Sequence, residues 1–545
     1  MIVDRLPERR EPWDICIAGS GPVGMAIALE LDALGQDVLV LESGGREVEP
    51  ERKEDSRALF ADARTHAPME IATCRALGGT SWTWGGRSVA LDDIDLEPRS
   101  WVSHSGWPIT HDDLRPWYPK ACDYLLCGNG PHELSPESLP AAIEDLTLSG
   151  LERWATESRV ALIHRDRIER SRRITLALNS TAVDLEFDAS LGQVEGFAVA
   201  TPGRHAKVRA RRIVLAMGGV ETTRLLIAVQ RRHPSLFGGV DGPLGRFYMG
   251  HISGKIANIL FERPEAIGDL DFFRDSTGSF VRRRIMLSAQ AQRKNQIMNI
   301  AFFPDNPPFY DYRHRSGVLS AVFLALAFPP TGRRILPEGI RLAHIGMPPR
   351  HYGAHLRNTI LGASAGARDM ANILRYRLLS RPRKPGFLVR NTAGKYALHY
   401  HGEQEPNPQS RISLSGEADR FGLPRAFIDF RFTDKDVASV VTAHRVLDEG
   451  LRAAAIGRLE YRYSEHELVG RVREQACDGY HQNGTTRMGA DPYTSVVDCD
   501  LKVHGLSNLY IASSSVFPTT GQANSTFPAV ALGLRLAHDL HARNG

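Results

Sequence analysis

A glycine-rich turn near the start constrains the fold of this chain more than any other feature. Residues 15–18 form a short apolar run, and the sequence GSGPVG follows directly at 19–24. After this turn apolar residues recur at helical spacing up to Gly35, and a second apolar run at 37–41 ends in Glu42. Strand, glycine turn, helix and strand in this order predict the first βαβ unit of a dinucleotide-binding domain.

This unit restricts the ligand. A helix that begins at the glycine turn directs its N-terminus at a pyrophosphate, and Glu42 can accept hydrogen bonds from both hydroxyls of an adenosine ribose. The same carboxylate would repel a 2′-phosphate, so the ligand is FAD or NAD. Further along the chain, another apolar strand at 212–217 runs into Gly218 and Gly219, and a helix begins near Glu221. A chain that returns to the nucleotide-binding sheet after an insertion favours FAD, because NAD domains are usually contiguous.

Length and composition set the remaining bounds. With 545 residues the chain exceeds the about 250 to 300 residues of a single hydrophobic core, so two domains or an interleaved pair are expected. A net charge of +4 gives no indication of a nucleic-acid partner. The six scattered cysteines favour reduced thiols, and residues 1–12 lack the apolar core of a signal peptide, so we expect a cytoplasmic protein.

The last quarter of the chain carries a histidine and an asparagine in distinctive settings. His481 lies in the sequence YHQNGTTRMG at 480–489, and Asn524 lies in GQANST at 521–526. Oxidation of an alcohol removes a proton from the hydroxyl, and histidine, with an unperturbed pKa of about 6.5, can take that proton near neutrality. Alternatively, His481 is a histidine bonded within a turn, and Asn524 caps a helix predicted at 525–538. Combined with the nucleotide-binding turn, the pair indicates a flavin enzyme that oxidises alcohols.

Several motifs, in this order, resemble those of the glucose-methanol-choline (GMC) oxidoreductase family, and the resemblance covers most of the chain. They are the glycine turn with Glu42, the sequence LGGTSWTWGG at 77–86, the strand and turn at 214–226, and the closing signature at 481–488 with 503–510. The resemblance implies an α/β fold in which a Rossmann-like FAD-binding domain carries an inserted α+β substrate domain. It places the FAD-binding domain at 12–100, 170–255 and 470–545, a connecting lid segment at 101–169, and the substrate domain at 256–469.

The same resemblance assigns roles to single residues. It implies His481 as the catalytic base and Asn524 as its partner, which holds the substrate oxygen. Gln404 lies in a segment similar to the sheet over the family's substrate pocket, so it either contacts substrate or ends an ordinary strand. The residues implied in FAD binding are Gly19, Gly21, Pro22, Gly24, Glu42, Ser43, Gly78, Gly79, Thr80, Ser81, Trp84, Gly85, Gly86, Val183, Ala216, Gly218, Ser513, Ser514, Asn524, Ser525 and Thr526.

Three departures from the family pattern qualify these roles. Some members attach FAD covalently through a histidine in the loop at 77–86, where this chain has Thr83, so noncovalent FAD is expected. Ser513 stands where the family usually has an acid near the ribityl chain. The Asn-Pro pair at the start of the closing helix is Asn524-Ser525 here, which keeps the asparagine and frees the following backbone N–H.

The middle of the chain does not indicate a metal site. His399 and His401 share one face of a predicted strand, which is a common arrangement for two ligands. No third ligand has a compatible spacing in the sequence. We therefore predict that the protein binds no metal.

Residues 316–384 are the part least explained by the resemblance. An apolar run at 317–328 is shorter than the about 20 residues that cross a bilayer, and it precedes a segment rich in arginine. This pattern predicts peripheral contact with a membrane or an anionic partner; alternatively, the run is a buried helix followed by a solvated basic face. The basic residues are Arg333, Arg334, Arg341, Arg350, Arg357, Arg368, Arg375, Arg377, Arg381, Arg383 and Lys384.

The sequence therefore predicts an FAD-dependent enzyme that oxidises the CH–OH group of a small-molecule alcohol, with oxygen or a quinone-like compound as electron acceptor. The sequences TTRMG at 485–489 and SSSVFPT at 513–519 resemble sugar-oxidising members of the family, which favours a sugar, glycoside or polyol. Two alternatives stay open. One is a lyase on the GMC scaffold, whose FAD undergoes no net reduction, and the other is a membrane-surface protein with a structural flavin.

Overall fold

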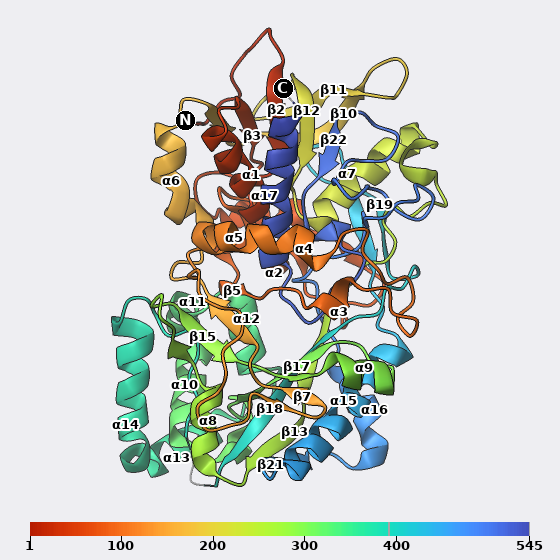
Figure 1. Ribbon diagram of the computed structural model, residues 1–545. Coiled ribbons are helices and arrows are strands. Elements are labelled where there is room, and N and C mark those ends of the chain that lie inside the picture. Colours follow the sequence, from red (N-terminus) through yellow and green to blue (C-terminus); the bar gives the residue numbers. More distant parts are fainter. Residues whose placement is uncertain (391–392, 544–545) are drawn as a thin grey trace.

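The computed structural model (Figure 1) describes residues 1–390 and 393–543. The chain forms two units, one above the other in this view, and each is built around its own sheet. The upper sheet is mostly parallel, and the lower sheet is antiparallel. The predicted fold class, a Rossmann-like α/β domain with an α+β substrate domain, is confirmed.

The upper sheet has eight strands, in the order β1-β9-β3-β2-β12-β11-β10, with β22 paired to β12. Its parallel strands are β1 (Ile2–Val3), β9 (Ile174–Ala177), β3 (Val38–Leu41), β2 (Trp13–Ala18), β12 (Arg204–Leu215) and β22 (Leu509–Ile511), and its antiparallel edge consists of β11 (Val194–Thr201) and β10 (Thr181–Phe187). Helices α1 (Pro22–Ala33) and α17 (Thr526–Ala542) pack against each other beside it, and α7 (Gly219–Arg232) follows β12. Because helices cover the central strands, these strands are apolar without alternation: Ile15, Ile17 and Val214 have no exposed surface.

Close packing explains the glycines of the turn between β2 and α1. Gly19 has a φ of +103°, and a Cβ there would lie 2.4 Å from the carbonyl oxygen of Ala216. A Cβ on Gly24 would lie 2.1 Å from the carbonyl oxygen of Gly19. Glycine is therefore the residue that lets the helix start this close to the ends of two strands.

The lower sheet has seven antiparallel strands in the order β21-β13-β18-β17-β16-β7-β6. The strands are β21 (Gly457–Tyr461), β13 (His251–Phe261), β18 (Lys395–Glu403), β17 (Ile300–Asp305), β16 (Ile285–Leu287), β7 (Leu146–Thr147) and β6 (Ala142–Ile143). Helices α15 (Asp434–Ala453) and α16 (Leu468–Gln475) pack on this sheet. The lower unit thus has its own apolar core between the sheet and these helices.

The two faces of the lower sheet differ in chemistry. Leu398 and Tyr400 of β18 belong to the apolar core that α15 covers. Because side chains alternate along a strand, His399 and His401 belong to the other face. The same alternation on β13 separates Ile252, in the core, from His251. The face opposite the helices therefore carries polar groups.

Strand pairing departs from the predicted domain boundaries. Strands β19 (Arg411–Ala418) and β20 (Pro424–Asp429) form a small sheet with β4 (Leu59–Phe60) and pack on α7 of the upper unit. Residues 411–429 therefore belong with the upper unit, although they were predicted in the substrate domain. The prediction missed this return because the two strands carry no nucleotide motif. In the opposite direction, β6 and β7 of the predicted lid segment extend the lower sheet.

A group of helices lies at the side of the lower unit (Figure 1). It consists of α10 (Gly317–Ala327), α11 (Pro329–Ile335), α12 (Glu338–Ile345), α13 (Tyr352–Leu361) and α14 (Ala363–Ile373), followed by a further helical turn at 374–379. The apolar run predicted at 317–328 is α10, whose Leu319, Phe323 and Leu326 are at most 2% exposed. One side of this helix is buried, as the alternative interpretation expected, whereas Phe328 at the end of the run is 59% exposed. Among the described residues, none of the helices has both the length and the apolar character that crossing a membrane requires.

Candidate active site

A cavity of about 560 Å³ lies between the glycine turn and the last quarter of the chain. Its lining includes Glu42 at the end of β3, and His481 and Asn524 from distant segments. All residues implied in FAD binding line this cavity except Gly24, Gly78 and Gly86. Gly24 lies behind the turn that it allows to close, so it shapes the cavity wall without forming it.

The carboxylate of Glu42 is fixed at the wall of this cavity. Its Oε2 accepts hydrogen bonds from the N–H of Ser20 at 3.1 Å and from the hydroxyl of Ser20 at 2.5 Å, and its Oε1 accepts one from the N–H of Gly44 at 2.8 Å. Burial raises the pKa of Glu42, and these hydrogen bonds oppose the rise. Since β3 and the glycine turn hold the side chain on both sides, its position does not depend on a ligand.

The residues around the cavity fit FAD. A Cβ built on Gly21 or Gly85 would meet no atom within 4 Å, so the backbone of the cradle is open to a dinucleotide. The side-chain oxygens Asn524 Oδ1 and Ser525 Oγ are buried and have no hydrogen-bond partner among the described residues. Buried polar atoms are normally paired, so these two indicate a bound polar group.

Two helix N-termini open onto the cavity. Pro22 at the start of α1 and Thr526 at the start of α17 both line it. A helix N-terminus carries a partial positive charge and unpaired N–H groups, so each can stabilise a negatively charged part of a cofactor.

The predicted cap of the second helix is wrong. Its N-cap is Ser525, which makes no side-chain capping bond, whereas the side chain of Asn524 bonds to His481.

His481 and Asn524 meet at the wall of the cavity. The Nδ2 of Asn524 lies 3.0 Å from Nε2 of His481, and Nδ1 of His481 lies 2.9 Å from Oδ2 of Asp478. Since an ionised carboxylate only accepts hydrogen bonds, the proton of the neutral ring belongs on Nδ1. The lone pair on Nε2 then accepts the amide N–H of Asn524. This is the tautomer that a general base needs, because the unprotonated nitrogen, Nε2, is the one that faces Asn524.

Asp478 is held by several donors. It is 4% exposed and accepts hydrogen bonds from the backbone N–H groups of His251 at 2.6 Å, Tyr480 at 2.9 Å and His481 at 3.3 Å. Burial by itself would raise the pKa of Asp478, but the imidazole of His481 and the N–H of His251 outweigh it and lower this pKa to about 2. The carboxylate is therefore ionised near neutral pH and fixes the orientation of the His481 ring.

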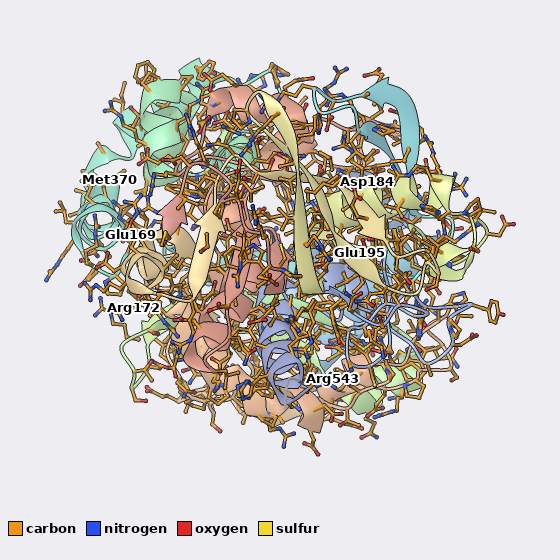
Figure 2. The ribbon with its side chains drawn as sticks, turned by 90° about the horizontal axis from the view of Figure 1, so that it is seen from above. Glu169, Arg172, Asp184, Glu195, Met370 and Arg543 are labelled. Atoms are coloured by element: carbon orange, nitrogen blue, oxygen red, sulfur yellow. The ribbon has the colours of Figure 1, made fainter. Side chains whose placement is uncertain are left out.

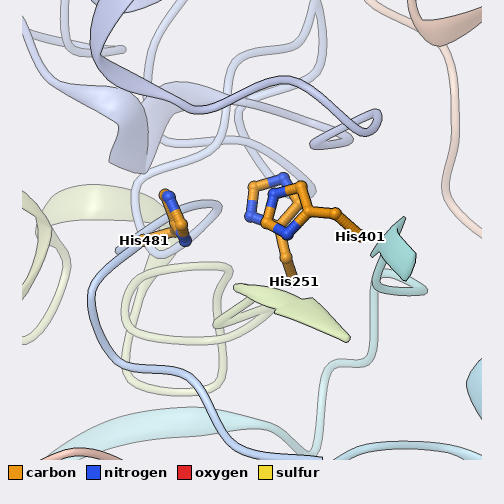
Figure 3. Close-up of side chains that lie close together, drawn as sticks. All are labelled: His251, His401 and His481. Atoms are coloured by element: carbon orange, nitrogen blue, oxygen red, sulfur yellow. The ribbon is translucent and has the colours of Figure 1, made fainter. Parts of the chain in front are cut away.

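Two further histidines lie beside His481 (Figure 3). The rings of His251 and His401 are stacked, with centroids 4.4 Å apart, and His251 meets His481 edge-on at 4.5 Å. Burial lowers the pKa values of His251, to about 3, and of His401, so both rings are neutral near pH 7. His399, the neighbour predicted with His401, stacks on Phe303 instead.

The chain is similar to known oxidoreductases in sequence and in fold. A family model described as GMC oxidoreductase matches residues 406–533. The 6′′′-hydroxyparomomycin C oxidase of Streptomyces lividus is 24% identical over 548 residues, which cover 96% of this chain and 90% of that protein. Paromamine 6′-oxidase of Streptomyces fradiae is 33% identical over 132 residues, which span 24% of this chain and 23% of that protein. The crystal structure of pyridoxine 4-oxidase from Mesorbium loti aligns with a TM-score of 0.51 at 15% identity and covers 97% of this chain and 99% of that chain.

Residues 406–533 match the GMC oxidoreductase family, and the chain is similar to an oxidase over almost its whole length. GMC oxidoreductases are FAD-dependent enzymes that act on CH–OH donors, and this chain is an enzyme of that kind. The matched segment contains His481 and Asn524, whereas the glycine turn and Glu42 lie outside it.

Gln404, predicted either to contact substrate or to end a strand, is not among the residues that line the cavity. Its side chain is fully buried; Oε1 accepts a hydrogen bond from the N–H of Gly250 at 2.7 Å, and Nε2 donates one to the carbonyl of Arg431 at 2.8 Å. Both ends of the amide are engaged, so Gln404 holds the backbone next to His251.

Ser513, which replaces the family's acid, lines the cavity, and its hydroxyl lies 2.6 Å from that of Ser515.

Sequence reasoning missed three residues of the GMC site: Asp478, His251 and Arg87. Asp478 precedes His481 by one helical turn's spacing, and an acid so near a candidate base was an available signal. Arg87 follows the glycine loop, lines the cavity and pairs with Glu152. His251 carried no signal, because only the pairing of β13 with β18 brings it to His401.

Proposed function

We propose that this GMC oxidoreductase oxidises a CH–OH group of a sugar, glycoside or polyol, with His481 as the base. The series Asp478, His481 and Asn524 at the cavity wall carries the proposal. Asp478 holds the proton on Nδ1, so Nε2 accepts the hydroxyl proton of the substrate. The amide N–H of Asn524 that bonds to Nε2 would turn to the substrate oxygen, which leaves the lone pair of Nε2 for the hydroxyl proton. FAD, when bound, supplies the acceptor for the hydride.

The substrate class rests on a narrower argument. The name of 6′′′-hydroxyparomomycin C oxidase specifies a hydroxylated substrate, and that of paromamine 6′-oxidase specifies oxidation at one position of a larger molecule. Asn524 and Arg87 also supply hydrogen-bonding groups at the cavity wall, and such groups can hold a polyhydroxylated compound. We therefore favour such compounds over simple apolar alcohols.

Anaerobic mixing tests the proposal. The purified holoenzyme is mixed with a panel of sugars, glycosides, polyols and simple alcohols, and loss of the visible flavin absorbance is recorded. Reduction by a member of the polyhydroxylated group supports the proposal, whereas product formation with the flavin still oxidised would support the lyase alternative. The same substrate is then tested with oxygen and with a quinone-like dye, because the two acceptors distinguish an oxidase from a dehydrogenase.

We also propose that FAD is held without a covalent bond. Thr83 lines the cavity in the loop where some GMC enzymes carry the linking histidine, and its hydroxyl donates to the carbonyl of Thr80 at 3.0 Å. An alkyl hydroxyl engaged in this way is a poor partner for a ring linkage. Acid precipitation should therefore release all of the flavin into the supernatant, and colour that stays with the pellet would contradict this proposal.

A cytoplasmic location is proposed on the state of the thiols. All six cysteines are free in the structure, and Cys16, Cys122 and Cys127 are buried. Unpaired thiols are typical of reducing compartments. Protein that is unfolded in a thiol-blocking reagent without prior reduction should carry the label on all six cysteines.

A second proposal is that the segment from α11 to the helical turn at 374–379 contacts an anionic membrane surface. Met347, Leu361 and Leu379 are 87%, 71% and 79% exposed, which is unusual for large apolar side chains. The exposed arginines of the segment include Arg333, Arg334, Arg357 and Arg375. Figure 2 shows Met370 of α14 at the edge of the molecule, on the same side as Glu169 and Arg172. Apolar side chains among arginines fit the interface of an anionic bilayer.

Not every basic residue of the predicted segment contributes to this surface. Arg341 is buried and pairs with Glu338 at 2.8 Å, and Arg377 donates to the carbonyls of Lys384 and Pro385. The side chain of Arg368 lies outside the described residues. The contact surface is therefore smaller than the run of charges in the sequence suggested.

Co-sedimentation with vesicles tests this surface. Binding to anionic vesicles should persist in part as salt rises, because the apolar contacts are not screened over the about 8 Å Debye length of physiological salt. Leu361→Glu should remove the salt-resistant part, whereas Val240→Glu, at an exposed apolar residue of the upper unit, should not. No binding at low salt would contradict the proposal.

A further inference from the structure

The cluster of His251, His401 and His481 has the composition of a metal site. One ring nitrogen from each lies within 4.8 Å of the others. Figure 3 shows the three rings converging from different segments, with His251 and His401 overlapping. In the sequence, His399 and His401 on one predicted strand offered only two ligands. Strand pairing instead brings His401 together with His251, and the loop of His481 closes the group.

The outer nitrogens of two of the three rings are held by partners that suit metal ligands. Nδ1 of His401 lies 2.7 Å from the hydroxyl of Ser253, and Nδ1 of His481 lies 2.9 Å from the carboxylate of Asp478. Nδ1 of His251 lies 3.8 Å from the same carboxylate, which is too far for a hydrogen bond, so this ring has no such partner. Histidines that bind metals almost always have such a partner on the second nitrogen, which fixes the tautomer and turns the first nitrogen toward the ion.

The inner nitrogens of two of the three rings lack partners, whereas Nε2 of His481 has Nδ2 of Asn524 at 3.0 Å, which would have to move aside for an ion. Nε2 of His401 and both ring nitrogens of His251 are buried without a hydrogen bond among the described residues. The two residues are 6% and 1% exposed. A buried polar atom without a partner is destabilising, and here such atoms from two strands face one histidine of the cavity wall. Asp478 also supplies a negative charge beside the cluster, which offsets part of a cation's charge.

We propose that His251, His401 and His481 bind Zn²⁺ and that bound Zn²⁺ inhibits the enzyme. Three neutral imidazoles with an open fourth position form a known type of zinc coordination. Zn–N bonds of about 2.0 to 2.1 Å place tetrahedral ligands about 3.3 Å apart, so the rings must move inward from their separation of up to 4.8 Å. The lone pair of Nε2 in His481 cannot hold both the ion and the substrate proton. The inhibition, but not the binding, rests on the proposed function.

Equilibrium dialysis of the holoenzyme against Zn²⁺ measures the binding directly. We expect one Zn²⁺ per chain at this site, and flavin reduction by substrate should stop when it is filled and return after chelation. His401→Gln should lower the zinc affinity by at least tenfold, and the turnover that remains in this variant should be insensitive to Zn²⁺. His399→Gln is the matched control, because His399 lies on the same strand and face but outside the cluster, so its zinc affinity should not change.

Two further variants keep the experiment decisive. The thiol of Cys477 is exposed and lies next to Asp478 in sequence, so Cys477→Ser must retain the zinc binding. If His401→Gln does not fold, Ser253→Ala removes the partner of Nδ1 and should weaken binding by about 10-fold to 100-fold. The proposal is overturned if zinc binds equally well to His401→Gln or Ser253→Ala, or if it depends on Cys477. Zinc binding without inhibition would keep the site and count against His481 as the base.

Discussion

The nucleotide end and the catalytic end of the cavity are built in different ways. At the nucleotide end, Gly19, Gly21 and Glu42 come from one βαβ unit, and each lies where the local sequence puts it. At the catalytic end, His481 and Asn524 come from separate loops, and His251 and His401 come from two strands of the other unit. The nucleotide end is therefore formed by one local sequence motif, whereas the catalytic end is formed by residues that are far apart in the sequence.

This difference has a physical consequence. The geometry of a glycine turn depends on a few backbone angles and close contacts, so a substitution there should mainly change cofactor binding. The ring of His481 depends on Asp478, which in turn is held by the backbone of His251. A substitution in that assembly should mainly change the chemistry, and the following predictions test this division of effects.

The largest effect is expected at His481. His481→Ala should slow reduction of the flavin by substrate about 100-fold to 10,000-fold, because the variant lacks the ring nitrogen, Nε2, that takes the hydroxyl proton. The measurement is anaerobic stopped-flow, with the flavin content determined in the same sample. His466→Ala, at an exposed position near α16, is the control. Loss of FAD in step with activity would instead show that His481 has a structural role.

Asp478 is expected to have the next largest effect, as a positioning residue. Asp478→Asn should slow flavin reduction by about tenfold to 100-fold, which is part of the general-base effect, and should alter its pH profile, because an amide does not fix the proton on Nδ1. Asp478→Glu should restore part of the rate. An unchanged pH profile with slower reduction would indicate that Asp478 only stabilises the loop.

Glu42 tests the opposite end of the cavity. Glu42→Gln should weaken FAD retention about tenfold, because a neutral amide accepts hydrogen bonds from ribose hydroxyls less strongly than a carboxylate. The fraction that keeps FAD should turn over at the normal rate. Ultrafiltration with flavin fluorescence measures retention, and Glu47→Gln, at an exposed neighbour, is the control. Slower flavin reduction in the fraction that keeps FAD would show that Glu42 also affects the chemistry, so that the two ends of the cavity do not have separate effects.

The smallest effect concerns a histidine outside both ends. His444 of α15 is fully buried, and burial lowers its pKa to about 4, which its bond to the carbonyl of Val440 only partly opposes. Between about pH 6.5 and pH 4 the unfolded state therefore binds a proton that the folded state does not, so stability falls as the pH falls. This group should contribute about 1.4 kcal/mol of the loss at about pH 5.5.

Urea unfolding at about pH 8 and about pH 5.5 measures this loss. His444→Gln should reduce the difference in free energy of unfolding between the two pH values. The exposed His466→Gln variant should leave that difference as it is in the native sequence. An equal difference in the native protein and in His444→Gln would show that the buried ring does not govern this pH dependence.

The sequence by itself determined the nucleotide-binding unit. The strand predicted at 15–18 is β2 (Trp13–Ala18), and the strand that ends at Glu42 is β3 (Val38–Leu41). The helix predicted at 525–538 is α17, which begins at Thr526 and extends to Ala542. These features follow from apolar periodicity and from glycine, whose effects reach only a few residues along the chain.

Only the tertiary structure decided the rest of the site. Asn524 satisfies a capping pattern in the sequence, yet its side chain bonds to His481, because the loop that carries Asp478 holds that ring within 3.0 Å. Gln404 was predicted either to contact substrate or to end a strand, but its side-chain oxygen accepts a hydrogen bond from the backbone N–H of Gly250. His251 and His401 meet because β13 pairs with β18 in one register. Strand register and loop closure depend on contacts between residues far apart in the chain, and no local pattern encodes those contacts.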